Sequence, residues 1–102
     1  MTKEEIKVYL EKYDENSMRA SLRKTQGMDD DPFVIRSKRL SLCIDCLPDY
    51  LKEVIKHKYI YKTSKRLYPW MAKGTLYKRL NKALEYLEFC MKDLEAIYDK
   101  ND

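Results

Sequence analysis

Apolar side chains recur at helical spacing from the first residues of this chain. The first stripe is formed by Ile6, Tyr9, Leu10 and Tyr13. Residues at this spacing share one face of a helix. Thr2 and Glu5 have the spacing of a capping box, in which hydroxyl and carboxylate each accept a hydrogen bond from a free backbone amide. The pattern therefore predicts an N-terminal helix, which Met18 and Leu22 extend after a break at residues 16–17.

Turn residues divide the middle of the chain into two further predicted helices. Gly27 lies in an evident loop and is suited to end the first helical region. Asp31 and Pro32 are typical of the N-cap and the first position of a second helix. The expected buried stripe of this second helix consists of Leu40, Cys43, Ile44 and Leu47. Pro48 ends it, and Asp49 is expected to cap a third helix whose inward residues are Leu51, Val54 and Ile55.

The C-terminal third has the clearest periodicity. Its apolar residues repeat in steps of four and three, as in a heptad seam: Leu76, Leu80, Ala83, Leu87, Cys90, Leu94 and Ile97. Leu84, Met91 and Tyr98 widen this seam into a core-facing band. A long helix is predicted over residues 74–98, and residues 63–71 are expected to be irregular because Pro69 interrupts any helix there. The fold class is therefore all-α, with four to five helices, a helix-turn-helix-like element and a long C-terminal helix.

Composition supports this class and limits the size of the protein. The 102 residues suffice for one domain with one modest core, and two Gly and three Pro are few for a sheet fold with many tight turns. No apolar run approaches the ~20 residues of a membrane span, and the charged start does not resemble a signal peptide. Three cysteines, an odd number, indicate a reducing compartment, so we expect a cytoplasmic protein without membrane contact.

Charge is distributed unevenly along the chain. The net charge is +4, but the segment between Glu53 and Glu85 contains no acid. Its nine cations are Lys56, Lys58, Lys62, Lys65, Arg66, Lys73, Lys78, Arg79 and Lys82. This leaves 12 of the 21 basic residues against all 17 acids in the rest of the chain. The asymmetry favours a polyanionic partner for the segment over a solvated basic face that binds nothing.

The start of the C-terminal helix concentrates these cations. If the leucines face the core, then Lys73, Thr75, Lys78, Arg79 and Lys82 project outward or sideways. Cations are electrostatically unfavourable near a helix N-terminus, whose free amides also attract phosphate. A bound anion would remove this conflict.

The segment from Leu47 to Leu87 resembles a known family. Its Leu47-Pro48, Lys52-Glu53-Val54, Tyr59, Ser64 and Gly74-Thr75-Leu76-Tyr77-Lys78-Arg79-Leu80-Asn81-Lys82-Ala83-Leu84 are similar to region four, the promoter-reading domain, of bacterial sigma factors. Phage late-gene transcription regulators of the ArpU and RinA type have the same pattern. With the length of the chain, this leads us to expect one helical domain over residues 1–102, with an N-terminal helical pair in 1–46 and a sigma-region-four-like segment in 47–102.

The resemblance also implies a DNA-binding surface. Its second helix would begin near Ala72 and lie in the major groove. The residues expected to meet DNA are Lys73, Gly74, Thr75, Tyr77, Lys78 and Arg79, to which the basic segment adds Lys65, Arg66 and Lys82. The chain departs from the family by a shorter segment between Ser64 and Gly74 that contains Pro69. Either the first helix is reduced to a turn stapled by Leu67, Trp70 and Met71, or the usual geometry of base reading is lost.

These observations predict a small regulator of transcription, of phage type, that binds double-stranded DNA in a bacterial or phage-infected cell. RNA polymerase is a second expected partner, because region four of sigma factors binds it. The alternative is an interaction protein that uses its basic, tyrosine-rich surface to block a nucleic-acid-binding protein. A homodimer through the seam of the C-terminal helix is also predicted, unless residues 3–22 fold back over that seam.

No catalytic site, cofactor or metal is expected. Cys43 and Cys46 would need His57 and Cys90 to form a zinc site, but Cys43 already belongs to an apolar stripe, so packing is the preferred interpretation. Residues 29–31 are three adjacent Asp, which seldom converge on one ion. His57 lacks an evident nucleophile. Tyr61, Tyr68 and Tyr77 lie in the basic segment, where base stacking and packing both remain open.

Overall fold

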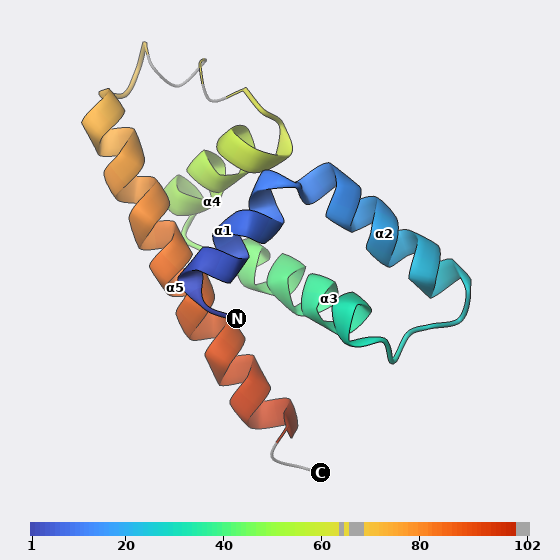
Figure 1. Ribbon diagram of the computed structural model, residues 1–102. Coiled ribbons are helices and arrows are strands. Elements are labelled where there is room, and N and C mark those ends of the chain that lie inside the picture. Colours follow the sequence, from blue (N-terminus) through green and yellow to red (C-terminus); the bar gives the residue numbers. More distant parts are fainter. Residues whose placement is uncertain (64, 66–68, 100–102) are drawn as a thin grey trace.

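The computed structural model describes residues 1–63, 65 and 69–99 and is all-α in these ranges (Figure 1). The elements are α1 (Lys3–Glu11), α2 (Tyr13–Thr25), α3 (Pro32–Asp45), α4 (Asp49–Ile55), a five-residue π-helix η1 (Lys56–Ile60) and α5 (Lys73–Asp99). Five α-helices, the last of them the long C-terminal helix, confirm the predicted all-α class in these ranges. α5 lies along one edge of the molecule, and α1, α3 and α4 pack against it.

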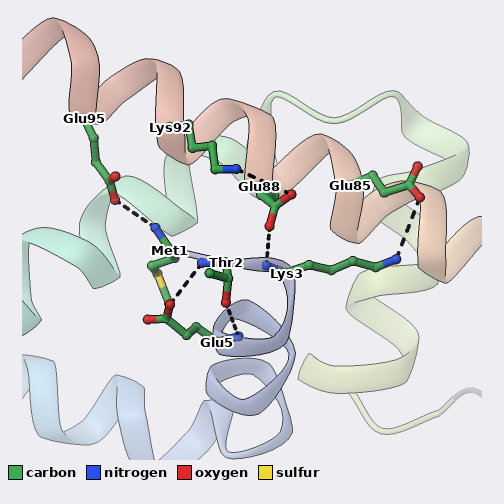
Figure 2. A network of polar contacts seen from close by, with 8 residues as sticks. All are labelled: Met1, Thr2, Lys3, Glu5, Glu85, Glu88, Lys92 and Glu95. Atoms are coloured by element: carbon green, nitrogen blue, oxygen red, sulfur yellow. Dashed lines mark hydrogen bonds and ion pairs between the residues drawn. The ribbon is translucent and has the colours of Figure 1, made fainter.

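The predicted capping box holds the start of α1. The Thr2 hydroxyl accepts from the Glu5 amide, and the Glu5 carboxylate accepts from the Thr2 amide, both at 3.2 Å. The hydrogen bonds from Thr2 also lower the pKa of the Glu5 carboxyl. Beside this cap, the Lys3 amide donates to Glu88 of α5 at 2.6 Å (Figure 2). The start of α1 is therefore fixed both within its own helix and against α5.

The N-terminal helical region breaks earlier than the sequence predicts. Lys12 separates α1 from α2, whereas the predicted break at residues 16–17 lies inside α2. Asn16 is buried there, and its side-chain amide donates to the Tyr9 carbonyl at 2.9 Å. The predicted extension of the apolar stripe is wrong, because Met18 and Leu22 are 75% and 62% exposed. The bend at Lys12 directs α2 away from α5, so α2 packs on α3 instead (Figure 1).

The turn between α2 and α3 follows the predicted chemistry, but α4 starts differently. Gly27, at φ 76°, ends α2 in the left-handed region. Asp31 caps α3 by accepting from the amides of Phe33 at 2.9 Å and Val34 at 3.4 Å. The predicted cap by Asp49 is wrong: Pro48 is the N-cap of α4, and no side chain bonds there. The carboxylate of Asp49 lies in the first turn instead, where it suits the helix dipole.

The seam of α5 is largely an internal core. One cluster unites the buried residues of five elements: Ile6, Leu10, Leu40, Cys43, Ile44, Leu47, Leu51, Val54, Ile55, Tyr59, Leu76, Leu80, Ala83, Leu84, Leu87 and Met91. Cys90 and Leu94 are partly buried against it, and Ile97 and Tyr98 are exposed. α1 and α3 thus cover most of the seam that was predicted as a dimer interface.

The connection from η1 to α5 takes the place of the first helix of a helix-turn-helix. Its described residues contain no α-helix. Of the predicted staple, Met71 packs against the core, Trp70 is 86% exposed, and Leu67 lies outside the described residues. Trp70 therefore does not staple a turn here. The element before this connection is α4 with η1, and the element after it is α5.

The two glycines allow a matched test of this backbone. Gly27→Ala is expected to lower the free energy of unfolding by about 1 kcal/mol, because alanine is strained at positive φ. Gly74→Ala is expected to raise it by up to about 1 kcal/mol, since Gly74 lies in the first turn of α5 with open space around it. Urea titrations of both variants check these signs; equal effects would contradict the placement of Gly27.

Candidate nucleic-acid interface

The predicted DNA-binding residues gather at the N-terminal end of α5. Lys73, Gly74, Thr75, Tyr77, Lys78 and Lys82 are exposed, and Arg79 is half-buried. Lys65 is exposed in the connection before α5, and Arg66 lies outside the described residues. The helix does not present all of these side chains in one direction. Residues at positions 79 and 82 lie on the side of α4, whereas positions 77 and 81 lie on the side of α1 and η1.

On the α4 side, two cations lie over one aromatic ring. The Arg79 guanidinium is 5.5 Å from the ring centroid of Tyr50, and the Lys82 ammonium is 5.9 Å from it. Lys82 is also 5.9 Å from the ring centroid of Tyr86. Its polar interaction with Tyr50 raises the pKa of Lys82. Arg79 and Lys82 are therefore oriented along the outer flank of α5 by aromatic neighbours.

At the tip of α5, backbone amides and cations lie together. Leu76 donates the first helical hydrogen bond to the Ala72 carbonyl at 3.0 Å, and alanine has no side-chain oxygen to cap the next free amides. The first turn contains no acid, and Lys73 lies 5.9 Å from the ring centroid of Tyr77. This end of the helix is thus positive both in its backbone and in its side chains, which suits a phosphate.

Beside this tip, a cleft of about 510 Å³ opens between α1, η1 and α5. Its apolar floor consists of Leu10, Tyr59, Leu80 and Leu84. Its polar rim consists of Lys7, Glu11, Lys58, Lys62, Tyr77 and Asn81. Three lysines, from α1, from η1 and from the connection after η1, therefore surround a cleft that adjoins the basic tip of α5. The sequence analysis missed Lys7, because only the fold brings α1 beside α5.

The backbone at the rim of this cleft is unusual. η1 is closed by a hydrogen bond from the Tyr61 amide to the Lys56 carbonyl at 2.7 Å, and Lys62 has φ 55°, a left-handed conformation that is uncommon for lysine. His57 secures this turn, since its Nδ1 lies 2.7 Å from the Thr63 hydroxyl and its carbonyl accepts from the Thr63 amide at 2.7 Å. Such conformations concentrate at functional sites. His57 therefore has a structural partner and supports the position of Lys58 and Lys62.

Acids from the N-terminal helices reach only part of this surface. Lys62 pairs with Asp14 of α2 at 3.1 Å, and Glu11 of α1 lies at the cleft. In the described part of the chain, no ion pair joins Lys58, Lys73 or Lys78 to a carboxylate. The fold thus reduces the positive charge on one side of the cleft and leaves it in place at the tip of α5.

The three cysteines lie near one another rather than near His57. Cys43 of α3 is buried, Cys90 of α5 is half-buried, and Cys46 is exposed. Burial, together with the thiols of Cys90 and Cys46, raises the pKa of Cys43 to about 12. Among the described residues, no group of three or more His, Cys, Asp or Glu side chains has the geometry of a metal site. The predicted role of Cys43 in packing agrees with its place in the core.

Thiol labelling tests this arrangement. In the native protein, Ellman's reagent is expected to modify exposed Cys46 rapidly and Cys43 at least ~100-fold more slowly, because Cys43 is buried and almost fully protonated near neutral pH. In denaturant, both rates should become equal. Peptide mapping by mass spectrometry identifies the labelled residue; rapid native labelling of Cys43 would contradict its burial.

Comparisons with protein-family models, with characterised proteins and with solved structures give no match for this chain. The resemblance to region four of sigma factors and to the phage regulators therefore stays a prediction. Within the described ranges, no helix is long and apolar enough to cross a membrane.

Proposed function

We propose that this chain is a small, non-enzymatic DNA-binding regulator of transcription, of phage type, that acts in the cytoplasm. The observation that carries the proposal is the tip of α5, where an acid-free first turn with Lys73 and the neighbouring Lys78 lies beside a cleft rimmed by lysines. A polyanion neutralises both features at once. The acid-free sequence between Glu53 and Glu85 supports this surface, since most of its cations lie at the cleft or on α5.

In this proposal, the first turns of α5 enter a groove of the duplex. The free amides and Lys73 bind a phosphate, and Lys78, which projects from the exposed face, reaches base edges or the next phosphate. Lys58 and Lys7 at the cleft contact the backbone of the strand that passes beside α1. Among the described residues the connection before α5 contains no α-helix, so in this proposal α1 and α4 support α5 from the side, in the place of the usual supporting helix.

Exposed aromatic side chains favour a second candidate function. Trp70 is almost fully exposed, and Tyr61 and Tyr77 are more than half exposed on the same basic segment. Tryptophan and tyrosine are enriched at the centres of protein interfaces. The alternative is therefore a protein that binds RNA polymerase, or that blocks a nucleic-acid-binding protein.

A titration of fluorescent duplex DNA separates the two candidates. The regulator is expected to raise the anisotropy of the duplex at low salt, and the signal should fall steeply as salt is added. If no duplex binding occurs at low salt, while the chain forms a stable complex with purified RNA polymerase, the DNA-binding proposal is wrong and the alternative holds.

A further inference from the structure

The outer flank of α5 has a self-complementary pattern. Lys82, Tyr86, Phe89 and Asp93 are separated by steps of four, three and four residues, so they share one face of the helix. All four are exposed, and Phe89 is 68% exposed. In Figure 1, α5 lies at the edge of the molecule, while α1, α3 and α4 occupy its inner side. This flank is distinct from the buried seam that contains Leu87 and Met91.

From this pattern we infer that two copies of the chain pair through the outer flanks of antiparallel α5 helices. Read in reverse, the four positions become acid, aromatic, aromatic and base. An antiparallel pair in this register brings Lys82 against the partner's Asp93, and Tyr86 against the partner's Phe89. The two-fold axis repeats both contacts, so the interface has two aromatic pairs at its centre and an ion pair toward each end.

The fold prepares this surface for a partner. Tyr50 of α4 lies beside Lys82, whose ammonium is 5.9 Å from the centroid of its ring, and extends the aromatic patch beyond α5. Asp93 is exposed and, in the described part of the chain, forms no ion pair with a cation. Phe89, which shares this face with Tyr86, exposes apolar surface that gains free energy by burial. The charges of Lys82 and Asp93 and the exposed aromatic surface between them are therefore both complementary to a second copy of the chain.

The pairing has a consequence that rests on the proposed function. In this register, Tyr77 of one copy lies at the same height along the helix axes as the partner's Tyr98. The distance along the axes between the two Tyr77 positions therefore equals the length of helix from Tyr77 to Tyr98, about 32 Å at about 1.5 Å per residue. This is close to the ~34 Å between successive major grooves on one side of a duplex. The dimer would therefore present two basic tips at the spacing of adjacent half-sites.

Charge reversal tests the pairing directly. Sedimentation velocity over the micromolar range is expected to show a dimer for the parent. Lys82→Glu and Asp93→Lys should each weaken association at least ~10-fold, because each places like charges together twice. The double variant, with the charges exchanged, should recover most of the association. Phe89→Ala should weaken it without unfolding, since this side chain is exposed. Lys24→Glu on α2 is the matched control and should associate like the parent.

A parent that stays monomeric, or a double variant that does not recover, overturns the inference. Its failure differs from failure of the proposed function. If the parent is a monomer that binds duplex DNA, only the dimer is rejected. If it forms a charge-dependent dimer that does not bind DNA, the proposed regulatory function is rejected and the pairing is established.

Discussion

Replacing Met91 by alanine is expected to lower the free energy of unfolding by about 2–5 kcal/mol, the range for truncating a large buried side chain. Met91 has no exposed surface and closes the core where α5 passes the N-terminal helices. Alanine in its place loses apolar contacts and leaves a cavity that the packed helices fill only in part. Urea unfolding followed by circular dichroism measures the loss.

Met18→Ala is the matched control for this variant. It makes the same chemical change on α2, where the side chain is largely exposed and where alanine is a good helix former. We expect a change within about 0.5 kcal/mol of the parent. If the free energy of unfolding falls by the same amount in both variants, the placement of the α5 seam in the core of a monomer is wrong.

The second large effect concerns DNA binding. The double variant Lys58→Gln/Lys78→Gln removes one cation from the cleft and one from the exposed face of α5. If each contacts a phosphate, the slope of log Kobs against log salt should decrease in magnitude by about 1.8, or 0.9 per contact. Affinity at low salt should fall accordingly. Anisotropy titrations at several salt concentrations measure the slope.

Lys24→Gln/Lys38→Gln makes the same charge change on exposed positions of α2 and α3. Its slope should equal that of the parent, because these residues lie outside the proposed surface. Equal slopes for both double variants would mean that binding depends on net charge alone and not on the cleft or the tip of α5.

The elements that sequence alone predicted well are those with a local physical cause. The capping box of Thr2 and Glu5, the Asp31 cap and the stop at Gly27 each depend on residues a few positions apart. The core stripes of α3 and α5 follow from one-face periodicity; the α3 stripe is buried as predicted and the α5 stripe is buried as far as Met91, whereas Ile97 and Tyr98 at its end are exposed. Local chemistry therefore sufficed for the fold class and for most of the core.

The errors arose where distant elements decide the outcome. Met18 and Leu22 continue the stripe of α1 by spacing, but the bend at Lys12 directs α2 to a different neighbour. The seam of α5 was predicted as a dimer interface because a sequence does not reveal which helices cover it. α1 and α3 cover the seam as far as Met91, whereas Ile97 and Tyr98 at its end stay exposed, and Phe89 is exposed on another flank.

The candidate site was predictable in part for the same reason. The cations at the tip of α5 lie on consecutive turns of one helix. Their exposure could be predicted because they fall between the leucines that mark the buried face. The cleft was not predictable, because Lys7 and Lys58 lie on different elements that meet only in the folded chain. The sequence also did not predict the left-handed backbone at Lys62, since lysine rarely adopts this conformation.

The measurement that tests the central claim most directly is the salt dependence of duplex DNA binding by the parent protein. The four lysines of the proposed contacts, Lys7 and Lys58 at the cleft and Lys73 and Lys78 on α5, predict a slope of log Kobs against log salt of about −3.6. Binding that is absent at low salt, or whose affinity does not change with salt, would contradict the assignment of this surface to DNA.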